Sequence, residues 1–197
     1  MQGLFRRSPR GRSTVGLVAA VSAAAAVAMP AAASAFVSSE VKSGRLIARS
    51  DAGSDIVKVS CGADLRVKVN GLDPSLGPAP CSAIRRVRVL GFGGGDTINV
   101  TRVGPRNGFT NQGLRRGRHV QAFGGKSADR ISGSRLSDLL AGGDGHDTLR
   151  GRAGADLLRG GTGSDRLIGG LGPDRLIGGR GRDFLRGGRG NDVRIDL

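Results

Sequence analysis

A nine-residue period constrains the C-terminal part of this chain more than any other feature. Read in steps of nine from Gly124, residues 124–195 divide into eight units without insertion or deletion. The first position is Gly and the sixth is Asp in all eight units, and the eighth is Ile or Leu in seven of them. A register kept over this length indicates a tandem structural repeat.

The glycines of each unit favour turns over helices. Glycine in a helix interior costs about 1 kcal/mol relative to alanine, whereas it readily adopts the positive φ angles of tight turns. The last three positions of a unit, such as 157–159, then predict a short strand whose side chains alternate between two faces. We expect the aliphatic eighth residue to face inward, and the arginines at the seventh and ninth positions, such as Arg166 and Arg159, to face solvent.

Two units per coil would place aspartates 18 residues apart one above another. Because strands stack at about 4.8 Å, the carboxylates of successive coils would repel one another unless a cation lies between them. Calcium suits such turns because it accepts about six to eight oxygen ligands, carbonyls included. Zinc would require Cys or His, and the array contains only His146. The two predicted columns are Asp129, Asp147, Asp165 and Asp183, and Asp138, Asp156, Asp174 and Asp192.

Residues 142–150, Gly-Gly-Asp-Gly-His-Asp-Thr-Leu-Arg, resemble the Gly-Gly-x-Gly-x-Asp-x-aliphatic-x nonapeptide of hemolysin-type (RTX) calcium-binding repeats. Residues 160–168 match the same pattern, and the units that begin at Gly169, Gly178 and Gly187 match it up to their Asp. The resemblance covers about two-fifths of the chain. It implies an all-β fold, a right-handed parallel β-roll (β-solenoid), in which the first six residues of each unit form turns that bind Ca²⁺.

The resemblance also implies which residues hold the ions, namely the sixth-position aspartates and the carbonyls of the turn glycines, with at most six ions within the array. Arginine or lysine stands at several third and fifth positions where the family often has acidic residues. We therefore expect weaker or fewer sites, best in the units from Gly142 to Gly178. The predicted metal-binding residues are Asp129, Asp138, Asp147, Asp156, Asp165, Asp174, Asp183 and Asp192, the extra acceptor Asp144, and Gly143, Gly145, Gly161, Gly163, Gly170, Gly172, Gly179 and Gly181.

Three alternatives stand against calcium binding. Arg–Asp ion pairs would replace the cation in an extracellular structural or adhesive solenoid that uses little or no calcium. A disordered Arg/Gly-rich nucleic-acid binder would have no reason to keep a nine-residue register, and it would lack aromatic platforms for bases. An enzyme is disfavoured because residues 36–123 contain one His, His119, and neither His-Glu-x-x-His nor Gly-x-Ser-x-Gly.

The first 35 residues have the pattern of an export signal. Four arginines between residues 6 and 12 precede an apolar run, residues 15–29, and Ala33-Ser34-Ala35 provides a small-residue cleavage site. A membrane-spanning helix needs about 20 apolar residues, more than this run contains, although a retained N-terminal anchor is the alternative. We predict a secreted, extracellular protein that is cleaved after Ala35 and keeps no transmembrane segment.

Residues 36–123 are interpreted as a short β-rich region that precedes the array, residues 124–197. The two cysteines, Cys61 and Cys81, are expected to form a disulfide worth about 3 kcal/mol, because exported chains with an even number of cysteines commonly pair them. Two free thiols are the alternative. Residues 91–98 resemble one isolated repeat, residues 101–121 are interpreted as a loop, and alternating side chains predict strands at 45–49, 56–61, 65–70 and 84–90.

The formal net charge of +15 includes four positive charges in the export signal. A solvated basic surface explains the remainder, and attraction to anionic cell-surface polymers is the functional alternative. The predicted partners are therefore calcium ions and such polymers, with no specific nucleic acid.

Overall fold

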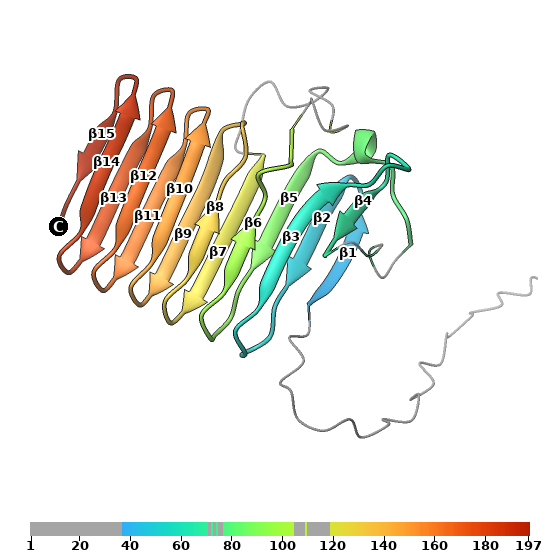
Figure 1. Cartoon of the computed structure of the whole chain (residues 1–197), viewed down its shortest axis with the longest axis horizontal. Helices are drawn as coiled ribbons and strands as arrows, with labels where there is room; N and C mark the ends of the chain where they lie inside the picture. Colours follow the sequence, from blue (N-terminus) through green and yellow to red (C-terminus); the bar gives the residue numbers. More distant parts are fainter. Residues whose placement is uncertain (1–36, 71, 73, 75–76, 105–108, 110–118) are drawn as a thin grey trace, which may run out of the picture. The chain divides into compact units, whose positions relative to one another are not determined.

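The computed structural model describes residues 37–197, apart from residues 71, 73, 75–76, 105–108 and 110–118 (Figure 1). The predicted export signal lies outside the described residues, as does most of the predicted loop at 101–121. Within the described part of the chain, no helix is long and apolar enough to cross a membrane.

The described residues form two sheets of stacked strands, in the order β1-β2-β5-β7-β9-β11-β13-β15 and the order β14-β12-β10-β8-β6-β3-β4. Strand pairs are parallel except β1 with β2 and β3 with β4. Figure 1 shows the strands of the array succeeding one another in chain order from β7 to β15. The elements are β1 (Ser38–Lys42), β2 (Arg45–Arg49), β3 (Ile56–Cys61), β4 (Val67–Val69), η1 (Cys81–Ala83), β5 (Arg86–Leu90), β6 (Thr97–Asn99), β7 (Val120–Lys126), β8 (Arg130–Ser132), β9 (Asp138–Asp144), β10 (Thr148–Ala153), β11 (Leu157–Thr162), β12 (Arg166–Leu171), β13 (Arg175–Arg180), β14 (Phe184–Arg189) and β15 (Val193–Ile195).

The predicted parallel β-roll is confirmed, and its coil is 18 residues long within the array. Leu149 pairs with Leu167 in one sheet, and Leu158 pairs with Leu176 in the other. These eighth-position leucines are fully buried between the sheets. Since one aliphatic residue per strand faces inward, the core is a narrow ladder of stacked leucines.

The same ladder continues through the region before the repeats. Ile131 on β8 pairs with Ile98 on β6, and Ile98 pairs with Val57 on β3. All three side chains are buried. Both sheets therefore cross residue 123 without interruption. Strands were predicted at the observed bounds of β2 and β3, whereas β4 and β5 are shorter than the predicted strands at 65–70 and 84–90.

The strands of the array are longer, and the turns shorter, than the resemblance implied. β11 contains the last three residues of one unit and the first three of the next. Gly161 pairs with Gly143 below and Gly179 above, and a Cβ at Gly161 would collide with the carbonyl oxygen of Gly143. Because glycine has no Cβ, the backbones of successive coils approach closely enough to continue the sheet into the next unit.

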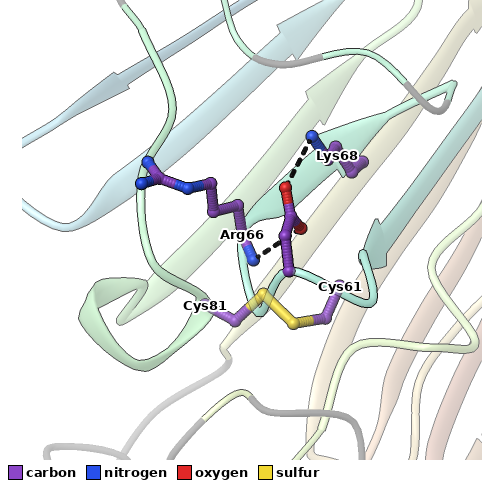
Figure 2. A network of polar contacts seen from close by, with 5 residues as sticks. Cys61, Arg66, Lys68 and Cys81 are labelled. Carbon is purple, nitrogen blue, oxygen red and sulfur yellow. Dashed lines mark hydrogen bonds and ion pairs between the residues drawn. A yellow bond between two sulfur atoms is a disulfide. The ribbon is translucent and has the colours of Figure 1, made fainter.

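The predicted disulfide between Cys61 and Cys81 is present, with a Cα–Cα distance of 6.0 Å. Figure 2 shows it beside the turn that leads into β4. In that turn the Arg66 N–H donates to the Asp64 carboxylate at 3.1 Å, and Lys68 forms an ion pair with Asp64, also at 3.1 Å. The disulfide thus ties the end of β3 to η1 at the N-terminal end of the two sheets.

Candidate metal centre

The sixth-position aspartates form two columns, as the 18-residue coil predicts. Each Asp except Asp138, which is the first residue of β9, ends a turn immediately before a strand, and the six from Asp129 to Asp174 are at most 3% exposed. Asp183 and Asp192, in the last coil, are only partly buried. A carboxylate in such a position needs partners, because burying an unpaired charge is costly.

In every sixth-position aspartate except Asp138, one carboxylate oxygen has such a partner in the preceding coil. The Asp129 N–H donates to Oδ1 of Asp147, and the Asp147 N–H donates to Oδ1 of Asp165, both at 2.8 Å. The other column repeats the pattern, with the Asp138 N–H donating to Oδ1 of Asp156 at 2.8 Å. Each column is therefore a ladder of charge-assisted hydrogen bonds that ties one coil to the next.

The second carboxylate oxygen, Oδ2, is buried without a hydrogen-bond partner in Asp129, Asp147, Asp165, Asp174 and Asp183. It packs against the first glycine of its own unit. A Cβ at Gly160 would collide with Oδ2 of Asp165 and would lie 2.5 Å from the carbonyl oxygen of Gly178. Oδ2 of Asp165 and the carbonyl oxygen of Gly178, in the next coil, thus both lie close to Gly160. Oxygens of these two kinds are the ligands that calcium prefers, so the residues present fit this ion.

Burial raises the pKa of these carboxyl groups. The pKa rises from 3.8 to about 7 for Asp129 and Asp138 and to about 6 for Asp147, chiefly because desolvation penalises the charged form. The neighbouring carboxylate of Asp147 raises the pKa of Asp129 further. The pKa is also raised, again chiefly by burial, for Asp96, Asp165 and Asp174. A cation beside these groups would favour their ionised form.

A family model described as "RTX calcium-binding nonapeptide repeat (4 copies)" matches residues 123–158, 132–167 and 159–193. Residues 123–193 are RTX repeats. The predicted resemblance is thereby confirmed, and the matched segment coincides with the regular part of the two aspartate columns. No curated protein and no solved structure matches the chain.

One aspartate column extends beyond the RTX repeats toward the N-terminus. The Asp96 N–H donates to Oδ1 of Asp129 at 2.7 Å, and the Asp55 N–H donates to Oδ1 of Asp96 at 2.9 Å. Asp96 belongs to the predicted isolated repeat, but Asp55 was missed. Residues 50–58 do carry Gly, Asp and an aliphatic residue at the fourth, sixth and eighth positions. Insertions that give spacings of 41 and 33 residues conceal this unit.

The other column begins only at Asp138. The matching positions in earlier coils are Val120, Val87 and Leu46, all buried. Both carboxylate oxygens of Asp138 instead accept hydrogen bonds from Ser134, from its N–H at 2.6 Å and from its hydroxyl at 2.8 Å. This local pairing explains why Ser replaces the usual second-position Gly in that unit.

The eight predicted turn glycines all have φ between +109° and +132°, which a side chain would strain. They occupy second and fourth positions and stack on one another, so that a Cβ at Gly163 would collide with the carbonyl oxygen of Gly145. Asp144 lies outside the columns: it is exposed and accepts a hydrogen bond from the Thr162 hydroxyl at 3.0 Å.

The side chains alone do not complete a metal site. Among the described residues, no group of three or more His, Cys, Asp or Glu is placed to hold a metal ion. A metal ion in the array would therefore take most of its ligands from backbone carbonyls. The ion pairs found in the described part of the chain, Arg49–Glu40 and Lys68–Asp64, lie before the array. Arginines of the repeats such as Arg159 are exposed, whereas the aspartates are buried. This arrangement disfavours Arg–Asp ion pairs as the means by which the charge of the carboxylates is neutralised.

Proposed function

We propose that this protein is a secreted calcium-binding protein whose RTX repeats hold Ca²⁺ between successive turns of the β-roll. The observation that carries the proposal is the buried Oδ2 atom, repeated from coil to coil without a hydrogen-bond partner. The ligands would be the eight sixth-position aspartates together with carbonyls of the glycines with positive φ, which Gly143, Gly161 and Gly179 exemplify, and Asp144 at the rim.

Within each turn, the chain contributes two things to the ion. The aspartate presents Oδ2 from inside the coil, while its Oδ1 accepts a hydrogen bond from the N–H of the coil before, which orients the carboxylate. The glycines bring carbonyl oxygens close because they carry no Cβ. A bound Ca²⁺ supplies the positive charge that the buried carboxylates lack. Binding to the folded state alone would add stability through linkage.

Secretion is supported by the basic-then-apolar pattern of residues 1–35 and by the disulfide, which forms in oxidising compartments. The role that fits these features is that of an extracellular scaffold rather than an enzyme. Mass spectrometry of the exported protein should find Phe36 as the first residue.

Titration of the metal-free protein with Ca²⁺, followed by calorimetry and by far-ultraviolet circular dichroism, tests the proposal. We expect heat of binding, a gain of β signal and a higher melting temperature, with a much weaker response to Mg²⁺, which demands a tighter octahedral site. No heat and no spectral change up to millimolar Ca²⁺ would show that the roll does not bind calcium.

A calcium-independent structural solenoid is the second candidate. The observation that favours it is the hydrogen-bond ladder, which already satisfies Oδ1 of each aspartate without an ion. In that case the remaining charge would be relieved by protonation, in keeping with the raised pKa of Asp138. A melting temperature that is high in chelator and unchanged by Ca²⁺ would support it.

A further inference from the structure

On the outer face of the seven-stranded sheet, each of four successive strands along the RTX repeats carries an arginine within its first three residues, and β10 and β14 each carry a second exposed arginine, Arg152 and Arg189. The four arginines near the strand starts are Arg130 on β8, Arg150 on β10, Arg166 on β12 and Arg186 on β14, and all four are exposed. We call them the arginine row. Because neighbouring strands lie about 4.8 Å apart, the row presents one guanidinium per about 4.8 Å along the stacking direction.

Strand register makes the row a zigzag between two columns of outward positions. Thr148 lies between Arg130 and Arg166 in one column, since it pairs with both. Arg150 pairs with Ser132 and Ile168 in the other column, and Ile168 pairs in turn with Arg186. Along each of these two columns, an arginine therefore alternates with a neutral side chain from one coil to the next.

The carboxylates that precede the first three strands of the row do not reach this face. Asp129, Asp147 and Asp165, which immediately precede β8, β10 and β12, are buried between the sheets. The neutral residues that alternate with the arginines in the two columns are Ser132, Thr148, Ile168 and Phe184. Negative charge therefore faces inward and positive charge outward, which leaves a one-signed field over the sheet.

The chemistry of the row selects a partner class. Guanidinium forks bind carboxylate and sulfate groups through two parallel hydrogen bonds. The hydroxyls of Ser132 and Thr148 between them suit sugar hydroxyls. Phe184, the aromatic residue on these four strands, already has Arg166 over its ring, 4.4 Å from guanidinium carbon to centroid, and so provides no open platform for stacking a base.

We propose that the arginine row binds a linear anionic polysaccharide, with carboxylate or sulfate groups of the polymer along the zigzag. A linear polymer fits because the guanidinium groups follow one direction, with no pocket needed. The surface lies outside the roll, whereas the proposed calcium positions lie inside it. The inference therefore does not rest on calcium binding.

Binding is measured by calorimetry with polygalacturonate (carboxylate), dextran sulfate (sulfate), neutral dextran and single-stranded DNA, in calcium and in chelator. The test variant replaces the row with R130Q, R150Q, R166Q and R186Q. The control removes the same charge from exposed arginines on the eight-stranded sheet with R86Q, R159Q, R175Q and R180Q. A third variant changes the row to lysine, which keeps the charge and loses the fork.

We expect at least one anionic polysaccharide to bind and neutral dextran not to bind. The glutamine row should weaken binding about tenfold or more, because four exposed charge contacts are lost, and should flatten its dependence on salt. The control variant should change the affinity less than about threefold. The variant with lysine in the row should lose less affinity than the glutamine variant and more than the control. Circular dichroism checks that each variant folds. If the variant with glutamine in the row unfolds, the variant with lysine in the row is compared with the control instead.

Three results would overturn the proposal. Equal losses in the row and control variants would mean that net charge alone attracts the polymer. Tighter binding of single-stranded DNA than of either polysaccharide would assign the face to nucleic acid. Absence of binding to both anionic polysaccharides at low salt would leave the row as a solvated surface.

Discussion

Replacement of Asp129 by asparagine separates the two roles that the carboxylate has in the fold. Oδ1 of Asp129 accepts the Asp96 N–H at 2.7 Å, whereas Oδ2 is buried without a partner against Gly124. The carbonyl oxygen of Gly142 borders the same space, 2.7 Å from where a Cβ of Gly124 would lie. Asparagine keeps the acceptor Oδ1 and places a neutral amide N–H₂ where Oδ2 was, so that the buried negative charge is removed.

The size of the effect follows from burial of the charge. The Asp129 side chain is 1% exposed, and its pKa is raised from 3.8 to about 7, chiefly by desolvation. This difference in pKa between the folded and the unfolded state means that, at pH 8, ionisation of Asp129 destabilises the folded state by about 4 kcal/mol. Because the amide must also be desolvated, we expect Asp129→Asn to stabilise the metal-free protein by about 1–3 kcal/mol.

Urea unfolding at pH 8, followed by circular dichroism, measures this change in chelator and in saturating Ca²⁺. Under the calcium proposal, the stability gained on adding Ca²⁺ should be smaller in Asp129→Asn than in the parent, because one ligand is lost. Asp144→Asn removes the same charge from an exposed residue and should change the free energy of unfolding in chelator by less than about 0.5 kcal/mol. A loss of more than about 1 kcal/mol in chelated Asp129→Asn would refute the account of Oδ2 as an unrelieved charge.

Three further perturbations test other parts of the structure. Because the folded state holds the Asp129 proton more tightly than the unfolded state, the melting temperature in chelator should be highest near pH 4 and fall as pH rises through about 7; a rise with pH would contradict this. Leu158 is fully buried, so Leu158→Ala should lower the free energy of unfolding in urea by about 2–5 kcal/mol. Leu171 is 53% exposed, and Leu171→Ala should lower it by less than about 1 kcal/mol. Gly160→Ala should lower the free energy of unfolding by about 1–3 kcal/mol, because the new Cβ meets Oδ2 of Asp165. Gly93→Ala should be neutral or slightly stabilising, because the nearest atom to its new Cβ is 3.6 Å away. Equal effects of the two substitutions would refute the steric argument.

Much of the fold is predictable because the repeat is local. The nine-residue repeat, with Gly, Asp and an aliphatic residue each at a fixed position, specifies a turn and a strand within each unit. Because two units form one coil, Asp147 lies above Asp129. The alternation of Leu158 with Arg159 shows which side chains face inward. These inferences need only the chain's own spacing, which no insertion disturbs between residues 124 and 195.

The site is less predictable because its partners come from different coils. Nothing in the spacing of Asp55 reveals that its N–H bonds to Asp96, since an insertion places the two residues 41 apart instead of 18. Nor does the pattern show that Val120 occupies the place of an aspartate below Asp138, or that Ser134 compensates. Both facts depend on which residues of successive coils lie one above another, and the insertions hide this from the sequence spacing.

The sequence by itself determined the repeat, the parallel β-roll and the two aspartate columns within the array, because regular spacing translates directly into stacking. Only the tertiary structure decided how each carboxylate is used: Oδ1 bonds to the backbone of the coil before, and Oδ2 is left buried beside a glycine carbonyl. The reason is physical. Hydrogen bonding and desolvation depend on the atoms that surround a group in space, and in a solenoid these belong to the coils above and below rather than to neighbours in the chain.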